Sequence, residues 1–233
     1  MTHPAIHRVM TLDLAFRPRP WPFAESRRDD VLAHFARQQR EKPNLWNGRV
    51  LLGRNPVFSA DRFSADYFEA DFASFLAWRD WGFADREVFN GFGMGALRCA
   101  DGAFLLGEMG QHTSNAGRIY FPSGTPDLDD IKGNAVDISG SVAREVEEET
   151  GLSTADYRAD AHWDCVVSGA AIAMIKVLNV ALTGEELRAR VAANLARQHQ
   201  PELAALHLVR ATSDLNSAMP RFVTAFIEKH FSK

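Results

Sequence analysis

Hydrophobic and polar positions follow two different patterns along the chain, and the change comes near residue 87. Before it, an apolar face predicts a helix over residues 28–40, and strand-like residues 45–58 surround the hairpin signal Asn47-Gly48. Phenylalanines at helical spacing predict a second helix over residues 64–78. Residues 57–92 hold 11 of the 24 aromatic side chains, a density that we interpret as core between two layers.

After residue 87, strands and helices are mixed. The pattern predicts a hairpin of residues 92–100 and 103–108 that turns at Asp101-Gly102. The other predicted strands are residues 117–122, 162–168, 171–182 and 206–211, and the predicted helices are residues 138–150, 184–198 and 217–231. Such an order predicts an α+β fold with a mixed sheet covered by helices on both faces.

Composition narrows the function. The chain has 233 residues, a net charge of -4 and a pI of about 6.1, which does not favour a nucleic-acid-binding protein. Cys99 and Cys165 each lie in an apolar run and are interpreted as reduced core thiols of a cytosolic protein. We find no signal-peptide pattern and no apolar stretch of the roughly 18 residues that a membrane span requires, so we expect a cytoplasmic protein without membrane contact.

The helix predicted over residues 138–150 carries the most informative pattern. Glu145 lies three and four positions before Glu148 and Glu149, so the three carboxylates share one face, while Glu147 points elsewhere. Repulsion within this face and the helix dipole near its C-terminus both cost stability, which Lys or Arg would avoid. A divalent cation would remove both costs, because it prefers oxygen ligands. An exposed charged face is the ordinary interpretation of a triple-Glu run taken alone.

Residues 144–152 read Arg-Glu-Val-Glu-Glu-Glu-Thr-Gly-Leu and match the second half of the Nudix box at every fixed position. The chain therefore resembles the Nudix hydrolases from about residue 87 onward. The resemblance implies a Nudix-type α/β/α sandwich over residues 87–233, with residues 1–86 as an N-terminal α/β extension packed on it. It also implies Mg²⁺ or Mn²⁺ bound by Glu145, Glu148 and Glu149, with Arg144 as the orienting residue.

The first half of the box departs from the family pattern. Counting back from Arg144, the usual Glu falls on Val136 and the usual Gly on Asp130. We expect an inserted loop, with Asp137 near the place of the missing glutamate. Glu202, before the strand at residue 206, occupies a place where such enzymes supply a further carboxylate; a surface glutamate is an equal alternative. The catalytic candidates are therefore Glu148, Glu145, Arg144 and Glu202.

Gly91, Gly93 and Gly95 do not form a dinucleotide fingerprint, since a hairpin turn and no helix follows them. They indicate a strand crowded by a neighbouring backbone or ligand.

The resemblance implies metal-dependent hydrolysis of a nucleoside diphosphate linked to another group. The N-terminal segments resemble a branch that includes UDP-sugar hydrolases, which favours nucleotide sugars, while coenzyme A and ADP-ribose derivatives stay open. We expect the N-terminal part to wall one side of the pocket, with Trp46 or Trp78 against the substrate. The alternative is a non-catalytic Nudix-fold sensor or binding module. The expected partner is a small nucleotide-derived molecule and not a nucleic acid, and a homodimer is left open.

Overall fold

A computed structural model of the chain describes residues 3–232. Its central strand is β5 (Val88–Arg98), which pairs in parallel with β13 (Ala171–Val180) and antiparallel with β6 (Phe104–Met109). On the other edge of β13 lies β12 (Trp163–Ser168), also antiparallel. The sheet is therefore mixed, as the sequence predicts.

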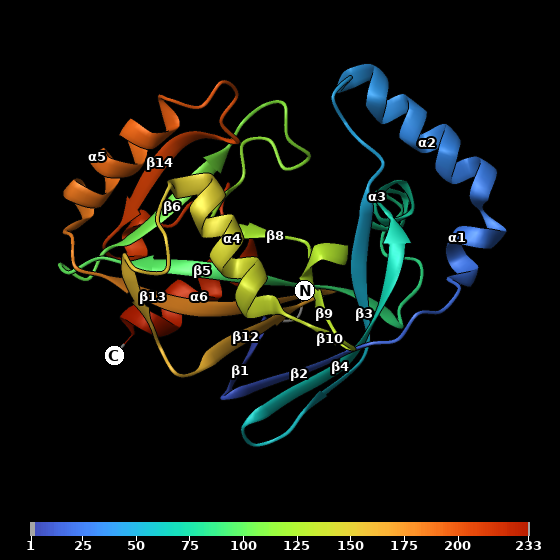
Figure 1. Cartoon of the computed structure of the whole chain (residues 1–233), viewed down its shortest axis with the longest axis horizontal. Helices are drawn as coiled ribbons and strands as arrows, with labels where there is room; N and C mark the ends of the chain where they lie inside the picture. The colour runs from blue at the N-terminus through green and yellow to red at the C-terminus, as the bar shows by residue number, and fades with distance from the viewer. Residues whose placement is uncertain (1–2, 233) are drawn as a thin grey trace.

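The first residues of β5 also pair with β3 (Arg49–Phe58), which begins a second wing of the sheet (Figure 1). In that wing β3 runs antiparallel to β4 (Arg62–Asp71), and β4 runs parallel to β2 (Thr11–Phe16). The remaining elements of this sheet are short strands and one longer edge strand: β7 (Ile119–Tyr120), β8 (Ser123–Gly124), β9 (Ile131–Lys132), β10 (Ala135–Val136), β11 (Tyr157–Ala159) and β14 (Leu203–Val209). Two 3-10 turns are η1 (Leu128–Asp130) and η2 (Thr212–Asp214).

Helices cover both faces of the sheet around β5. On one face α4 (Ile138–Thr150) and α5 (Gly184–Leu195) bury Val142, Val146 and Leu187 in one hydrophobic cluster. On the other face α6 (Arg221–Phe231) buries Phe226 with Met94 in a second cluster. The predicted α+β fold, a Nudix-type α/β/α sandwich with a mixed sheet, is confirmed.

Glycines in β5 allow α4 to lie unusually close to the sheet. A Cβ atom on Gly93 would stand 2.5 Å from a methyl group of Val142, and one on Gly95 would stand 2.5 Å from a methyl group of Val146. Any larger residue would push the helix away. This confirms that the glycines mark a crowded strand, and it fixes the depth at which α4 presents its carboxylates.

The N-terminal part has its own core. Helices α1 (Pro22–Ser26), α2 (Arg28–Glu41) and α3 (Phe72–Asp80) cover β3 and β4, and their apolar side chains enclose Trp78, which is fully buried. The strand β1 (Ala5–Val9) leaves this part and pairs antiparallel with β12. The strands β1 and β3 lie before residue 87 and pair with β12 and β5, which lie after it, so the two parts of the chain share one sheet. A domain boundary at residue 87 stays a prediction.

The structure corrects two local predictions. The helix predicted over residues 64–78 begins only at Phe72, because β4 occupies the first half, where Phe63, Ala65 and Tyr67 alternate into the core. Asn47-Gly48 is not a hairpin turn: the Asn47 side chain accepts the Ala73 N–H at 2.8 Å and anchors the start of α3. Cys99 and Cys165 are buried free thiols, as predicted. No helix within residues 3–232 is long and apolar enough to cross a bilayer.

Candidate active site

Helix α4 is fixed at both ends. The Asp137 carboxylate accepts the Gly140 N–H at 2.9 Å as its N-cap, and Gly151 ends the helix with a φ of 74°, which a glycine adopts without strain. This sets the rotation of the helix. Glu145 and Glu149 face strand β8. Glu147 lies on the other side of the helix, near Tyr157: burial raises the pKa of the Tyr157 phenol, and the charge of Glu147 adds to this rise.

Strand β8 lies directly against these carboxylates. It pairs with β5 between Gly124 and Gly93, so it is held in place by the central strand. Gly124 lets the Glu145 carboxylate lie against the strand, because a Cβ atom at this position would stand 2.3 Å from its Oε1 atom and would displace it. The Ser123 N–H donates to Oε1 of Glu149 at 3.4 Å. The backbone of β8 therefore forms the wall that the helix carboxylates face.

The carboxylates at this wall are electrostatically unsatisfied. Burial raises the pKa of Glu145 to about 7; Arg144 opposes this rise, and the charges of Glu148 and Glu202 add to it. Burial, followed by the charge of Glu145, raises the pKa of Glu149 well above its ordinary value. Four glutamates thus act on one another across a small space. A bound cation would reverse these shifts, because opposite charge favours the ionised form.

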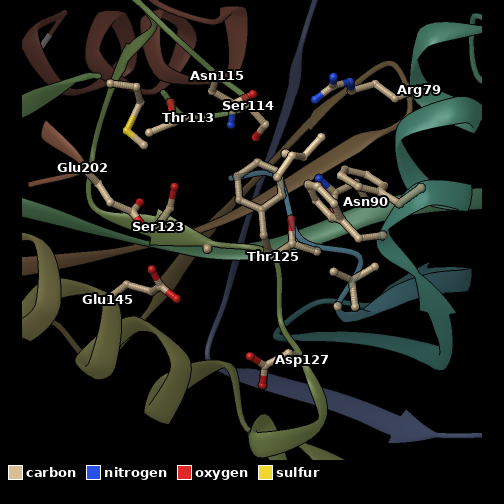
Figure 2. Close-up of a pocket in the computed structure, with 18 of the residues that line it drawn as sticks. Arg79, Asn90, Thr113, Ser114, Asn115, Ser123, Thr125, Asp127, Glu145 and Glu202 are labelled. Carbon is tan, nitrogen blue, oxygen red and sulfur yellow. The ribbon is translucent and has the colours of Figure 1, made fainter. Parts of the chain in front are cut away.

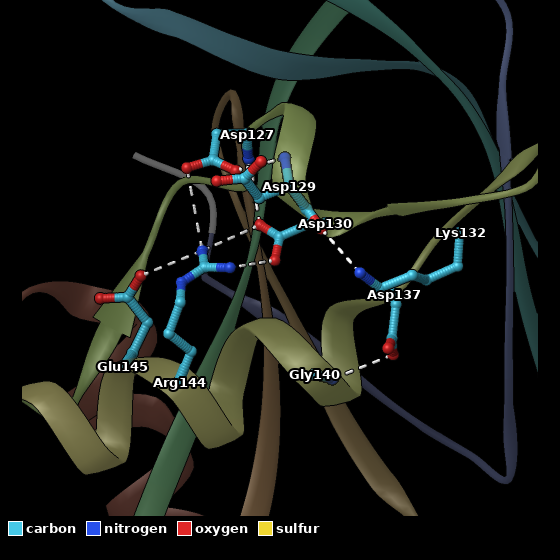
Figure 3. A network of polar contacts seen from close by, with 8 residues as sticks. All are labelled: Asp127, Asp129, Asp130, Lys132, Asp137, Gly140, Arg144 and Glu145. Atoms are coloured by element: carbon cyan, nitrogen blue, oxygen red, sulfur yellow. Dashed lines mark hydrogen bonds and ion pairs between the residues drawn. The ribbon is translucent and has the colours of Figure 1, made fainter.

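Arg144 offsets only part of the charge of the glutamates, because it is shared between Asp130 and Glu145 (Figure 3). Its Nη1 and Nη2 donate to the two Asp130 oxygens at 2.6 and 3.1 Å, and Asp130 is only 2% exposed. Nη2 also lies 3.6 Å from Oε1 of Glu145. The bidentate pair fixes the guanidinium plane beside Glu145, so Arg144 is placed to orient that carboxylate.

The partner of Arg144 corrects one expectation. Asp137 was expected near the place of the missing box glutamate, but it caps α4, and Asp130 from η1 pairs with the arginine. Counting back from Arg144 puts Asp130 at the box position that is usually a glycine. The count does not allow for the irregular chain between β8 and α4. An acidic run, Asp127 to Asp130, was the available signal.

A cleft of about 600 Å³ runs from α4 to the N-terminal part of the chain (Figure 2). Glu145 and Glu202 line one end of it, and Trp46 with the side chains of α3 line the other. Glu202 precedes β14 and is exposed, and its backbone carbonyl accepts the Gly110 N–H at 2.7 Å. The loop carboxylate and the helix carboxylate thus meet in one cleft.

The five predicted site residues are not equivalent in the structure. Glu145 and Glu202 line the cleft, Glu149 is buried behind β8, Glu148 is exposed and Arg144 is tied to Asp130. Within residues 3–232, no three His, Cys, Asp or Glu side chains stand close enough together to hold an ion as they are. The donors are nevertheless of the type that Mg²⁺ prefers, and exposed Glu148 has room to turn.

Sequence reasoning missed two polar residues of the cleft. Tyr120 is buried; burial chiefly raises the pKa of its phenol, and its hydroxyl accepts the Asn115 amide N–H at 3.2 Å. Asn90 lies beside Tyr120 in the cleft wall, and its side-chain oxygen is buried without a hydrogen-bond partner among the described residues. The position of Asn90, directly before the first glycine of β5, was the only signal in the sequence.

Comparison with known proteins gives likeness in fold alone. No family model and no curated protein matches the chain. The box helix packed on a mixed sheet, with a second helical layer behind, makes the architecture Nudix-type. Similar solved structures include a Nudix hydrolase from M. smegmatis, RenU, with 13% identity over 60% of this chain and 80% of that chain, at a TM-score of 0.38.

Two further structures overlap in a similar way. A MutT protein from Methanosarcina mazei Go1 is 18% identical over 61% of this chain and 92% of that chain, at a TM-score of 0.38. A bifunctional NMN adenylyltransferase/ADP ribose pyrophosphatase from Francisella tularensis is 11% identical over 68% of this chain and 45% of that chain, at a TM-score of 0.41. At these scores the overlaps carry no argument about activity, which has to come from the site itself.

Proposed function

We propose that the protein is a hydrolase that cleaves the diphosphate bond of a nucleoside diphosphate linked to another group. The observation that supports this most is the set of mutually repelling carboxylates at the end of an open cleft. A fold selected only for stability would not keep buried glutamates of raised pKa side by side. A substrate diphosphate carries the same sign of charge, so the site needs cations to accept it.

The donor set fits Mg²⁺ or Mn²⁺, with Glu145, Glu148 and Glu149 as ligands. When bound, such a cation would neutralise the diphosphate and lower the pKa of a water molecule for attack on phosphorus. Arg144, held by Asp130, orients Glu145. Glu202, on a separate loop at the same end of the cleft, would accept the proton of the attacking water.

The cleft suggests one property of the group that the diphosphate carries. The buried oxygen of Asn90 has no hydrogen-bond donor among the described residues, and we infer that a ligand in the cleft supplies one. A sugar hydroxyl is such a donor, and a diphosphate is not. Nucleotide sugars, ADP-ribose and coenzyme A derivatives all carry such hydroxyls, so Asn90 does not choose among them, and the preference for a nucleotide sugar rests on the resemblance of the N-terminal segments.

The test is a screen of nucleoside diphosphate derivatives with Mg²⁺ or Mn²⁺, with phosphate measured after phosphatase treatment. We expect turnover that EDTA abolishes and either cation restores. Full turnover in metal-free protein would refute the mechanism. Tight binding of one derivative without any turnover would instead indicate the alternative, a Nudix-fold sensor or binding module.

A further inference from the structure

A second cleft of about 560 Å³ adjoins the first and differs from it in charge. The two share part of their lining, including Asn90, Phe92 and Tyr120, so they are continuous. The charged side chains that line the second cleft are Arg79, Arg118 and Arg221, and no carboxylate of residues 3–232 lines it. In a chain with net charge -4, three arginines around one cavity are a local reversal of sign.

The arginines come from three separate parts of the fold. Arg79 lies on α3, and Figure 2 shows its guanidinium directed toward the cleft, with Nε paired to Asp80 at 2.9 Å. Arg118 is exposed on the loop before β7, and its side chain makes no hydrogen bond or ion pair within the described residues. Arg221 lies at the start of α6 and has an interaction within the chain. Three elements thus bring positive charge to one cavity.

Apolar side chains in the lining of this cavity strengthen the interaction of its arginines with a bound anion. Its floor is apolar, formed by Phe92, Met94 and Phe222. Charge interactions beside such a low-dielectric floor are stronger than on an open surface. The N-terminus of α6 borders the same cavity, and Pro220 offers it no side-chain cap. That terminus does not define a site, but its dipole has the same sign as the arginines.

We infer that the second cleft binds an anionic group, a phosphate monoester or a carboxylate, on the part of the substrate beyond the cleaved diphosphate. The inference rests on the proposed function, which places the diphosphate at the carboxylates of the first cleft. Neither Glu145 nor Glu202 lines the second cleft, so the arginines are not simply the counter-charges of those groups. The substrate would then carry two negatively charged groups: the diphosphate, bound through a metal ion in the first cleft, and a second anionic group, bound by arginines in the second cleft.

The test compares ligands that differ by one anionic group. Binding of NADP⁺ against NAD⁺, and of UDP-glucuronate against UDP-glucose, is measured by calorimetry with Ca²⁺, which supplies the cation that the carboxylates need, and each ligand is checked for hydrolysis after the titration. The diphosphate contribution cancels within each pair. We expect the anionic member of at least one pair to bind roughly tenfold more tightly, as charge-assisted hydrogen bonds allow. The pair that shows the preference identifies a phosphate or a carboxylate as the preferred group.

Arg118→Gln should remove most of that preference and leave the neutral member unchanged. The matched control is Arg98→Gln, which removes an exposed arginine at the far end of β5. Thermal melts of both variants should equal that of the wild type. Equal binding within both pairs, or an equal loss for both members in Arg118→Gln, would overturn the inference. Turnover without any such preference would refute the inference alone, and a preference without turnover would refute the proposed hydrolysis alone.

Discussion

Glutamates near the end of a helix normally weaken it, and α4 has two in its last turn with no basic residue beside them. The structure shows that they differ in environment: Glu149 is 6% exposed, while Glu148 is exposed to solvent. A buried glutamate behind β8 has a fixed position, and an exposed one is free to turn. At the residue scale, Glu148 is therefore the carboxylate whose loss tests metal binding with the least damage to packing.

Replacing Glu148 by Gln keeps the shape and removes a charge. We expect kcat to fall by roughly 100-fold, as when one electrostatic group of a site is lost. Metal-free stability should be unchanged or higher, because a like charge near the helix C-terminus has gone. Glu147→Gln is the control, since that side chain lies on the Tyr157 side of the helix. Equal losses of kcat in the two variants would contradict the assigned helix face.

Asp130 provides a second test at this scale. Asp130→Asn removes the charge that fixes the Arg144 guanidinium, and we expect kcat to fall roughly 10- to 100-fold, as for other residues that support a metal ligand. The Kd for Mn²⁺, measured by calorimetry, should rise with it. The control is Asp129→Asn, whose backbone N–H, and not its carboxylate, bonds to Asp127. An unchanged kcat in Asp130→Asn would mean that Arg144 needs no orientation.

Sequence patterns identified the carboxylates but not their surroundings. The shared face of Glu145, Glu148 and Glu149 was predicted from their spacing on a helix, and their role as metal ligands was predicted from the resemblance to the Nudix box. Asp130 and Asn90 were missed, because they reach the site through an irregular loop and through the order of strands, and neither has a local signature. The face of a helix on which a residue lies follows from spacing along the chain, whereas the contact between η1 and α4 depends on the tertiary fold.

At the element scale, β4 and α3 show the same limit. Phenylalanines between residues 63 and 75 fit a helical period, yet the first of them belong to a strand held by β2 on one side and β3 on the other. Pairing on both edges outweighs local helix preference. Helices α2 and α4, each with one apolar face, follow their predicted ranges closely. The strands β12 and β13, which pair on both edges, were also predicted closely, so β4 is an exception in which helix-like spacing of apolar residues hid a strand.

Two of the four tryptophans in residues 1–86, Trp46 and Trp78, lie in different environments. Trp46 is 80% exposed in the cleft, whereas Trp78 is fully buried and donates its indole N–H to the Asp85 carbonyl at 3.0 Å. Trp46→Ala should raise KM with little change in kcat or Tm. Trp78→Ala should lower the free energy of unfolding by about 3–5 kcal/mol. Kinetics and thermal melts of both variants check this; an unchanged KM in Trp46→Ala would remove that side chain from the substrate site.

At the scale of the whole molecule, one buried aspartate joins distant parts of the chain. Asp164 on β12 is 2% exposed and accepts hydrogen bonds from Arg8 of β1 at 3.2 Å and from Lys229 of α6 at 2.9 Å. Burial alone would raise the pKa of Asp164, but these hydrogen bonds together hold it below its ordinary value. The ionised carboxylate is therefore more stable in the folded protein than in the unfolded chain.

Asp164→Asn should lower the free energy of unfolding by about 2–4 kcal/mol at pH 7, because two cations lose their buried partner. A lowered pKa gives stability that is present above the unfolded pKa of about 3.9 and is lost as pH falls through the folded value. The difference between wild type and variant should thus shrink in acid, as measured by denaturant unfolding from pH 7 to pH 3. Asp13→Asn, which breaks the exposed pair with Arg62, is the control and should change little. A difference that is constant with pH would contradict the assigned role of the charge.

The pairing of β1 with β12 also has a consequence for the newly made chain. Residue 5 lies opposite residue 167 in the sheet, so β1 waits for a partner that is translated much later. At about 5–20 residues per second, the ribosome needs roughly 10–30 s to reach it. During that interval β1 is an unpaired edge that other nascent chains can occupy. The sheet around the site therefore stays incomplete until β12 and the strands that follow it, β13 and β14, have been made.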